Sequence, residues 1–175
     1  MLLADLGERI CILGPSNSGK STLANAIALK CGLEPIHLDR LFHLPGSNWQ
    51  PRPLDAFIAL HDAALTGERW VIEGNYTRCL PQRLRRATGL ILLDVATTTS
   101  MIRYLRRTLF ERERAGALEG GRDSLKWVMV HHILFRSPGN RKRMALIFDE
   151  QALPKVALSS LRDIERAYHR WGLQR

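Results

Sequence analysis

The sequence lacks any hydrophobic stretch approaching the roughly 18 residues that a membrane helix needs. Near the N-terminus, Leu2-Leu3-Ala4 is followed at once by Asp5, so no signal-peptide core is expected. Cysteine is scarce: the three cysteines are odd in number and far apart, and no pair has metal-ligand spacing. Internal repeats, low-complexity tracts and linkers are also missing. We therefore expect a cytoplasmic protein with no membrane segment.

The length and composition favour one domain. The chain has 175 residues, of which 45% are hydrophobic and 25% are charged, as in ordinary globular proteins. This length allows a substantial hydrophobic core. We expect a single domain over residues 1–175.

The positive charge of the chain is concentrated in one segment. Of the 26 Lys and Arg residues, 15 lie between residues 76 and 143, and nearly all of these 15 are arginine. The same segment has only 5 Asp and Glu residues. The planar guanidinium group suits bidentate contacts with phosphate. Three interpretations stay open: a cover over nucleotide phosphates, a nucleic-acid surface, or a solvated face. No helix-turn-helix, RNA-binding or zinc signature supports the second.

Residues 14–21 match the pattern G-x-x-x-x-G-K-[ST] in full. A short apolar run precedes them, and apolar residues at helical spacing follow, which predicts strand, loop and helix. Loop N–H groups and the positive helix end would bind phosphates, Lys20 would reach the outer phosphates, and the Ser21 hydroxyl would help to hold Mg²⁺. The sequence therefore predicts a nucleoside triphosphate site. Its expected residues are Gly14, Pro15, Ser16, Asn17, Ser18, Gly19, Lys20, Ser21 and Thr22.

Short apolar runs alternate with helical patterns along the rest of the chain. This alternation predicts an α/β three-layer sandwich around a five-stranded parallel sheet. The expected strands cover residues 9–13, 36–38, 70–73, 90–94 and 155–158. The expected helices begin near residues 20, 53, 80, 100, 124, 137 and 161. In the helix beginning near residue 100, the arginines at 103, 106, 107 and 114 cluster on one face.

Acidic residues follow three of the expected strands, where parallel sheets bind ligands. Asp39 is a candidate base for a substrate hydroxyl, or a Mg²⁺ ligand through water; a helix cap is the alternative. Glu73, with Gly74 and Asn75, could order Mg²⁺ water or hold the acceptor; the alternative is a strand-ending turn. Asp94 could assist the metal or cap the next segment.

The aromatic and histidine side chains of the sequence are less informative. Phe42 and Trp49 would form either an acceptor wall or a small satellite of the core. The histidines lack partners at metal-ligand spacing and are interpreted as packed or surface residues. They are His37, His131 and His132.

Four segments together carry a resemblance to a known family. They are residues 14–21, 36–39, 69–76 and 92–94, which contain the strand-two aspartate and the Glu-Gly-Asn-Tyr turn. The chain resembles, to about residue 171, the bacterial DNA-topology-modulation proteins. These are adenylate-kinase-related P-loop proteins with the nucleoside-monophosphate-kinase fold.

The resemblance implies ATP at residues 14–21 and the strand order 2-3-1-4-5. It also implies an arginine-rich helical lid, about residues 101–143, in which Arg103 and Arg107 would be catalytic and Arg106 would bind nucleotide. Two residues depart from the family pattern. Asn17 replaces a usual glycine and should be tolerated because its side chain can point outward, whereas Glu73 replaces a usual aspartate and lengthens the contact with an acceptor.

The expected function is therefore that of a P-loop kinase using ATP and Mg²⁺, acting as a monomer or homodimer. The acceptor would be a small molecule held near Asp39, Glu73 and the loop at 40–52. Adenosine monophosphate is not the expected acceptor, because the acceptor and lid pattern of adenylate kinases is missing. The alternatives are a nucleic-acid-associated ATPase that affects DNA topology, and a nucleotide-binding regulator without catalysis.

Overall fold

The computed structural model describes residues 1–47, 49–96, 98, 101 and 137–174. Several expected features lie outside the described residues. These are the arginines Arg103, Arg106 and Arg107, the histidines His131 and His132, the helices near 100 and 124, and most of the 101–143 region.

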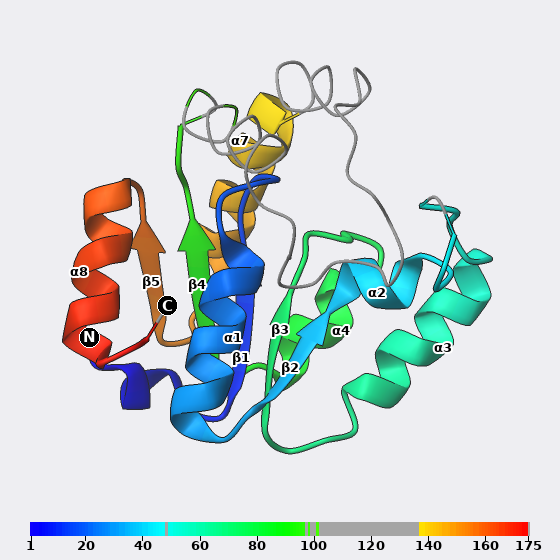
Figure 1. Ribbon diagram of the computed structural model, residues 1–175, viewed down its shortest axis with the longest axis horizontal. Coiled ribbons are helices and arrows are strands. Elements are labelled where there is room, and N and C mark those ends of the chain that lie inside the picture. The colour runs from blue at the N-terminus through cyan, green and yellow to red at the C-terminus, as the bar shows by residue number, and fades with distance from the viewer. Residues whose placement is uncertain (48, 97, 99–100, 102–136, 175) are drawn as a thin grey trace.

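Five parallel strands form one sheet in the order β2-β3-β1-β4-β5 (Figure 1). The strands are β1 (Arg9–Leu13), β2 (Glu34–His37), β3 (Trp70–Glu73), β4 (Gly89–Leu93) and β5 (Lys155–Leu158). The expected fold class and strand order are confirmed. Because the order reverses at β1, the loop that follows β1 lies where such sheets bind their ligands.

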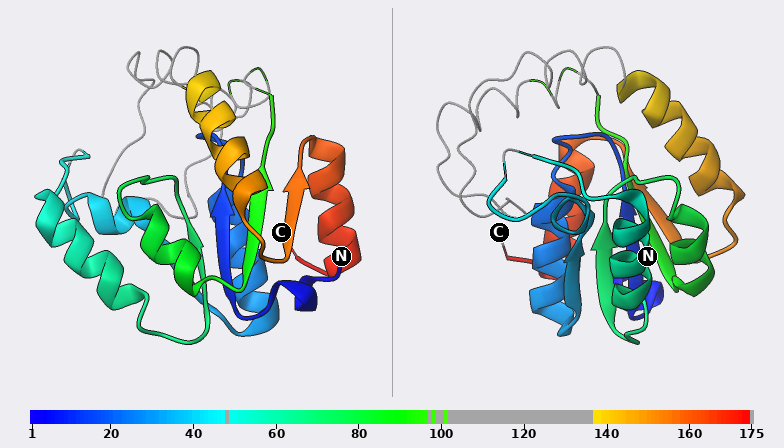
Figure 2. Two further views of the ribbon diagram at one scale, coloured as in Figure 1. Left: turned by 180° about the vertical axis from the view of Figure 1, so that it is seen from behind. Right: turned by 90° about the vertical axis from the view of Figure 1, so that its right-hand side faces the viewer.

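Helices cover both faces of the sheet and make a three-layer structure (Figure 2). One face is covered by η1 (Leu3–Leu6), α1 (Lys20–Cys31) and α8 (Leu161–Trp171). The other is covered by α3 (Leu54–Ala64), α4 (Leu80–Arg86) and α7 (Ser137–Glu150). Among the described residues, no helix has the length and apolar character required to cross a membrane.

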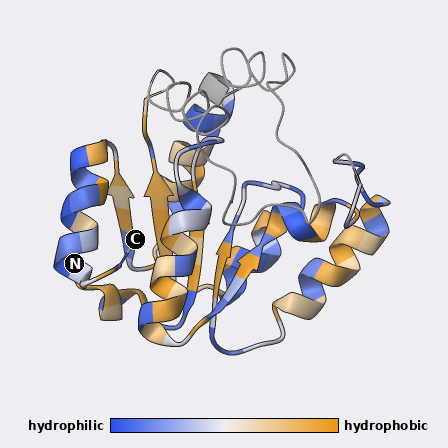
Figure 3. Ribbon diagram, in the orientation of Figure 1, coloured by the Kyte–Doolittle hydropathy of each residue, from blue (hydrophilic) through white to orange (hydrophobic). Residues whose placement is uncertain are grey.

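The core consists of two layers because successive strand residues point to opposite faces. In β1, Ile10 and Ile12 pack with α1 and α8, whereas Cys11 and Leu13 pack with α3, α4 and α7. All four side chains are fully buried. A sheet covered on both sides thus explains the uninterrupted apolar strands of the sequence. Figure 3 shows these strands flanked by helices that carry both hydrophobic and hydrophilic residues.

The segment after β2 differs from the expectation. Residues 40–52 were expected to form a loop, but the chain makes one helical turn, α2 (Leu38–Phe42), directly after β2. Leu38 is fully buried and Phe42 packs against the same core layer, which a helix allows because residues four apart share one face. Asp39 therefore lies in the first turn of a short helix, rather than at the start of a loop.

Candidate active site

The loop at residues 14–21 connects β1 to α1 and requires unusual backbone conformations. Gly14 and Gly19 have φ angles of 146° and 98°, and Asn17 has a φ angle of 62°. The left-handed region favours glycine, and asparagine is among the residues that tolerate it best. Asparagine is therefore tolerated at position 17 because of its backbone conformation. From the sequence, tolerance was instead expected because the side chain can point outward. Of the other loop residues, Pro15 and Ser18 are buried, Ser16 is half-buried and Thr22 is exposed.

Lys20 supplies a positive charge at the start of α1. Its Nζ donates a hydrogen bond of 2.8 Å to the carbonyl oxygen of Pro15, within the loop. Burial lowers the pKa of Lys20, and the carboxylates of Glu73 and Asp39 act in the opposite direction. The loop therefore joins a lysine to the N-terminus of a 12-residue helix, a combination that suits a phosphate ligand.

Glu73 is the centre of a buried polar cluster at the end of β3. Its Oε1 accepts hydrogen bonds from the Ser21 hydroxyl, at 3.0 Å, and from Nδ1 of His37, at 3.0 Å. Burial raises the pKa of Glu73, but the hydrogen bonds from His37 and Ser21 and the charge of Lys20 outweigh it and leave the pKa lowered. The lowered pKa favours an ionised carboxylate beside the loop at residues 14–21.

The donors in this cluster fit a magnesium ion. Mg²⁺ prefers oxygen ligands and is commonly held by one or two protein oxygens together with substrate phosphates. The Ser21 hydroxyl and the Glu73 carboxylate are oxygen donors in direct contact, one at the first turn of α1 and the other at the end of β3. These two residues would hold the ion when it arrives with a nucleotide.

Asn75 fixes the turn after β3 against the loop, and Gly74 lets the same turn pack closely against α2. The Asn75 amide makes two hydrogen bonds to the backbone of Gly14, accepting from its N–H at 3.2 Å and donating to its carbonyl at 2.9 Å. A Cβ atom on Gly74 would lie 2.9 Å from Cβ of Leu38, so glycine is needed there for close packing. The substrate contacts predicted for Asn75 and Gly74 stay predictions; in the structure Asn75 holds the loop at Gly14, and Gly74 allows the turn to pack against Leu38.

A buried arginine, which sequence reasoning missed, supports the same turn. Arg83 in α4 is fully buried and donates to the carbonyls of Gly74, at 2.7 Å, and Tyr76, at 3.2 Å. Burial lowers the pKa of Arg83. The sequence showed only a short basic helix here, and nothing in its pattern separates Arg83 from its exposed neighbour Arg85.

Asp39 contacts the turn after β3 through a tyrosine. The Tyr76 hydroxyl donates a hydrogen bond of 2.6 Å to Oδ1 of Asp39. Asp39 also acts electrostatically on Lys20, so the structure brings together the lysine and the two candidate carboxylates Asp39 and Glu73. The roles of Asp39 as a base or metal ligand are not tested by this arrangement and stay predictions.

The aromatic candidates lie beside this contact. Phe42 packs against Phe57 and Tyr76, with ring centroids 5.1 Å and 4.9 Å away, and is only partly buried. Trp49 packs edge-on against His43 at 5.1 Å. Phe42 is therefore a satellite of the core that reaches the neighbourhood of Asp39, and an acceptor contact for either aromatic stays a prediction.

Asp94, at the end of β4, has a different partner. Arg141 in α7 donates to both carboxylate oxygens and to the main-chain carbonyl of Asp94. The ion pair raises the pKa of Arg141. In this structure Asp94 anchors α7 to the sheet, and its predicted role near the metal stays a prediction.

Comparison with known proteins finds similar structures but no similar sequence. No family model matches the sequence, and no curated protein matches it. Among solved structures, the chain is similar to a gluconokinase from Sinorhizobium meliloti, with a TM-score of 0.57 and 19% identity over 95% of this chain and 91% of that one. It is also similar to a shikimate kinase from Bacteroides thetaiotaomicron, with a TM-score of 0.54 and 16% identity over 93% and 95%. The chain is also similar to a sugar kinase from Janibacter, with a TM-score of 0.50 and 18% identity over 91% of both chains. At these identities the likeness establishes the fold, that of P-loop nucleoside-monophosphate-kinase-like proteins.

Proposed function

We propose that this chain is a P-loop phosphotransferase that moves the γ-phosphate of ATP to a small-molecule acceptor. The observation that carries the proposal is the position of Lys20 and Ser21, at the end of a phosphate-binding loop and beside the buried carboxylate of Glu73. Structural neighbours that are small-molecule kinases support the same class of reaction.

Each residue would have a distinct task. Loop N–H groups and Lys20 bind the phosphates, and Ser21 and Glu73 hold Mg²⁺. The ion, when bound, neutralises charge on the phosphates. Asp39 accepts the proton of the acceptor hydroxyl, and the Tyr76 hydroxyl orients that carboxylate. The arginines Arg103, Arg106 and Arg107 would cover the phosphates from the 101–143 region.

We also infer membership of the DNA-topology-modulation group of adenylate-kinase-related proteins. Two of the four segments that carry this resemblance, those with the strand-two aspartate and the turn at 73–76, contact one another through Asp39 and Tyr76. The resemblance names no acceptor, and the acceptor site is the part of the proposal that needs an experiment.

The direct test is a screen for transfer of labelled γ-phosphate from ATP to nucleosides, nucleotides, sugars and small acids. A labelled product made by the wild type and not by Lys20→Ala identifies the acceptor class. ATP hydrolysis that depends on added DNA, with no labelled small molecule, would contradict the proposal and favour a nucleic-acid-associated ATPase.

A further inference from the structure

Four side chains from three elements form a chain of three hydrogen bonds that passes through Glu73. Ser21 and Asn25 lie four residues apart on one face of α1. Ser21 bonds to Glu73, Glu73 to His37, and Nε2 of His37 lies 2.9 Å from Oδ1 of Asn25. His37 and Glu73 are register partners at the ends of β2 and β3. This chain of hydrogen bonds therefore links the start of α1 to the ends of two neighbouring strands.

The direction of the bond between His37 and Glu73 does not depend on the charge of the ring. An ionised carboxylate can only accept, so the proton lies on Nδ1 of His37. The other ring nitrogen faces the Asn25 amide, which can accept from it or, with its oxygen and nitrogen exchanged, donate to it. In both arrangements His37 donates to Glu73.

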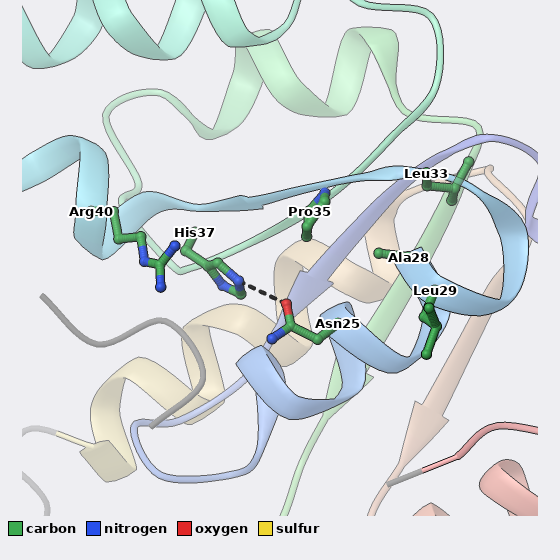
Figure 4. A pocket seen from close by; sticks show the side chains of 7 residues that line it. All are labelled: Asn25, Ala28, Leu29, Leu33, Pro35, His37 and Arg40. Carbon is green, nitrogen blue, oxygen red and sulfur yellow. Dashed lines mark hydrogen bonds between the residues drawn. The ribbon is translucent and has the colours of Figure 1, made fainter. Parts of the chain in front are cut away.

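The position of His37 leaves it little freedom to move. Its side chain is 4% exposed and that of Glu73 is 6% exposed. One side of the ring borders an open groove of about 500 Å³ between α1 and β2. Figure 4 shows the ring pointing from β2 toward Asn25 on α1, with Arg40 further along the same edge. Asn25 thus holds the ring on the groove side, and Glu73 holds it on the side of the phosphate-binding loop.

We propose that His37 is a positioning residue that fixes the Glu73 carboxylate beside Ser21 and so sets the affinity of the nucleotide site for Mg²⁺. This inference rests on the proposed function, in which Glu73 and Ser21 hold the ion. Both bonds to Glu73 fall on Oε1, so His37 and Ser21 together define the rotamer of this carboxylate. Partners that orient a metal-binding side chain commonly change metal affinity by about 10- to 100-fold when they are removed.

Two amide substitutions separate the two bonds of His37. In His37→Asn the amide nitrogen lies as many bonds from the backbone as Nδ1 does, so a donor toward Glu73 is retained. In His37→Gln the amide nitrogen corresponds to Nε2, so a polar group toward Asn25 is retained and the donor to Glu73 is lost. His61→Leu is the matched control, because His61 is a fully buried histidine whose Nδ1 bonds to Asp62 on α3.

The measurement is the Kd of ATP, by calorimetry, with excess Mg²⁺ and with EDTA, for each variant and for Glu73→Gln. The ratio of interest is the Kd in EDTA divided by the Kd in excess Mg²⁺, which measures how much the ion strengthens ATP binding. We expect this ratio to fall about 10-fold or more in His37→Gln and Glu73→Gln. It should stay within about 3-fold of wild type in His37→Asn and in the control, while the Kd in EDTA is similar throughout.

The outcomes that overturn the inference differ from those that overturn the proposed function. The two variants differ in whether position 37 keeps a hydrogen-bond donor toward Glu73. If His37→Asn and His37→Gln give equal Kd ratios, whether both normal or both lowered, the bond from His37 to Glu73 does not determine the affinity for Mg²⁺. A wild-type ratio near one would show that Mg²⁺ does not strengthen ATP binding. That result would contradict the magnesium role of Glu73 and overturn the inference, although the protein would still bind ATP. Failure of the wild type to bind ATP in either condition would overturn the proposed function itself.

Discussion

The phenol oxygen of Tyr76 lies 2.6 Å from Oδ1 of Asp39 and connects the turn after β3 with the helix after β2. Burial raises the pKa of Tyr76, and the charge of Asp39 raises it further, so the phenol stays protonated and acts as a donor. One oxygen of Asp39 is therefore held by the protein, and the carboxylate has a defined orientation at the edge where ligands bind.

Removal of this hydroxyl should weaken catalysis without affecting ATP binding. A hydrogen bond to a charged group contributes about 1.5–3 kcal/mol, so Tyr76→Phe should lower kcat on the order of 10-fold. The KM for ATP should stay close to wild type, because Tyr76 does not contact the phosphate-binding loop in the described contacts. Steady-state kinetics with the acceptor found in the screen measure both constants. An unchanged kcat would show that Tyr76 does not orient a catalytic group.

Asp39→Asn and Glu73→Gln should differ in kind. If Asp39 is the base, its loss lowers kcat while the affinity for ATP is retained, because the loss affects only the chemical step. Glu73→Gln should weaken the binding of ATP with Mg²⁺, because the amide leaves Ser21 without its carboxylate partner. If both substitutions only weaken binding of ATP with Mg²⁺, then Asp39 belongs to the metal site and the base lies elsewhere.

Glu73 should also make the stability of the fold depend on pH in the acid range. Burial raises its pKa, but the bonds from His37 and Ser21 and the charge of Lys20 lower it more, so the folded pKa lies below the ordinary 4.5. A lowered folded pKa adds stability above the unfolded pKa, and this contribution is lost as the pH falls through the folded pKa. The free energy of unfolding of wild type minus that of Glu73→Gln should therefore be constant above the ordinary pKa of 4.5 and shrink as the pH falls below it, through the lower folded pKa. Urea denaturation of the two proteins gives this difference, and a constant difference would contradict the predicted ionisation.

The three arginines at 103, 106 and 107 should not be equivalent. If these arginines cover ATP, the alanine substitution of the best-placed one should reduce the rate on the order of 10³-fold. The substitutions of the other two should reduce it much less. A nucleic-acid surface predicts instead similar small losses for each, and DNA binding that weakens by about 0.9 log units per log unit of salt for each phosphate contacted. Turnover of the three single variants, with DNA binding at several salt concentrations, decides between them.

The sheet could be predicted well because its signals are local. Apolar runs bounded by turns gave the strands, most clearly β1, β3 and β4, whose residues are buried on both faces of the sheet. The resemblance implied the strand order. The short helix α2 was not expected, because its single turn is stabilised by the packing of Leu38 and Phe42 against the core. Local patterns do not reveal contacts of that kind.

The candidate site was predicted in part, and the misses share a cause. The residues of the phosphate-binding loop and the acidic strand ends were selected from sequence. The partners of those residues were not, because the contacts of His37, Arg83 and Arg141 join segments that are 9 to 47 residues apart. The parallel register of β2 and β3 was the one signal available for His37, since it places this histidine opposite Glu73.

The most direct test of the account is the rate of γ-phosphate transfer by Lys20→Ala, beside the wild type, with the acceptor found in the screen. In the proposed function Lys20 supplies a charged contact to the transferred group, so its loss should reduce the rate by at least about 10²-fold. Circular dichroism and thermal unfolding should show that the variant is folded, because Lys20 donates only to the Pro15 carbonyl in the described contacts. A folded Lys20→Ala protein with turnover close to wild type would contradict the assignment of this loop to phosphoryl transfer.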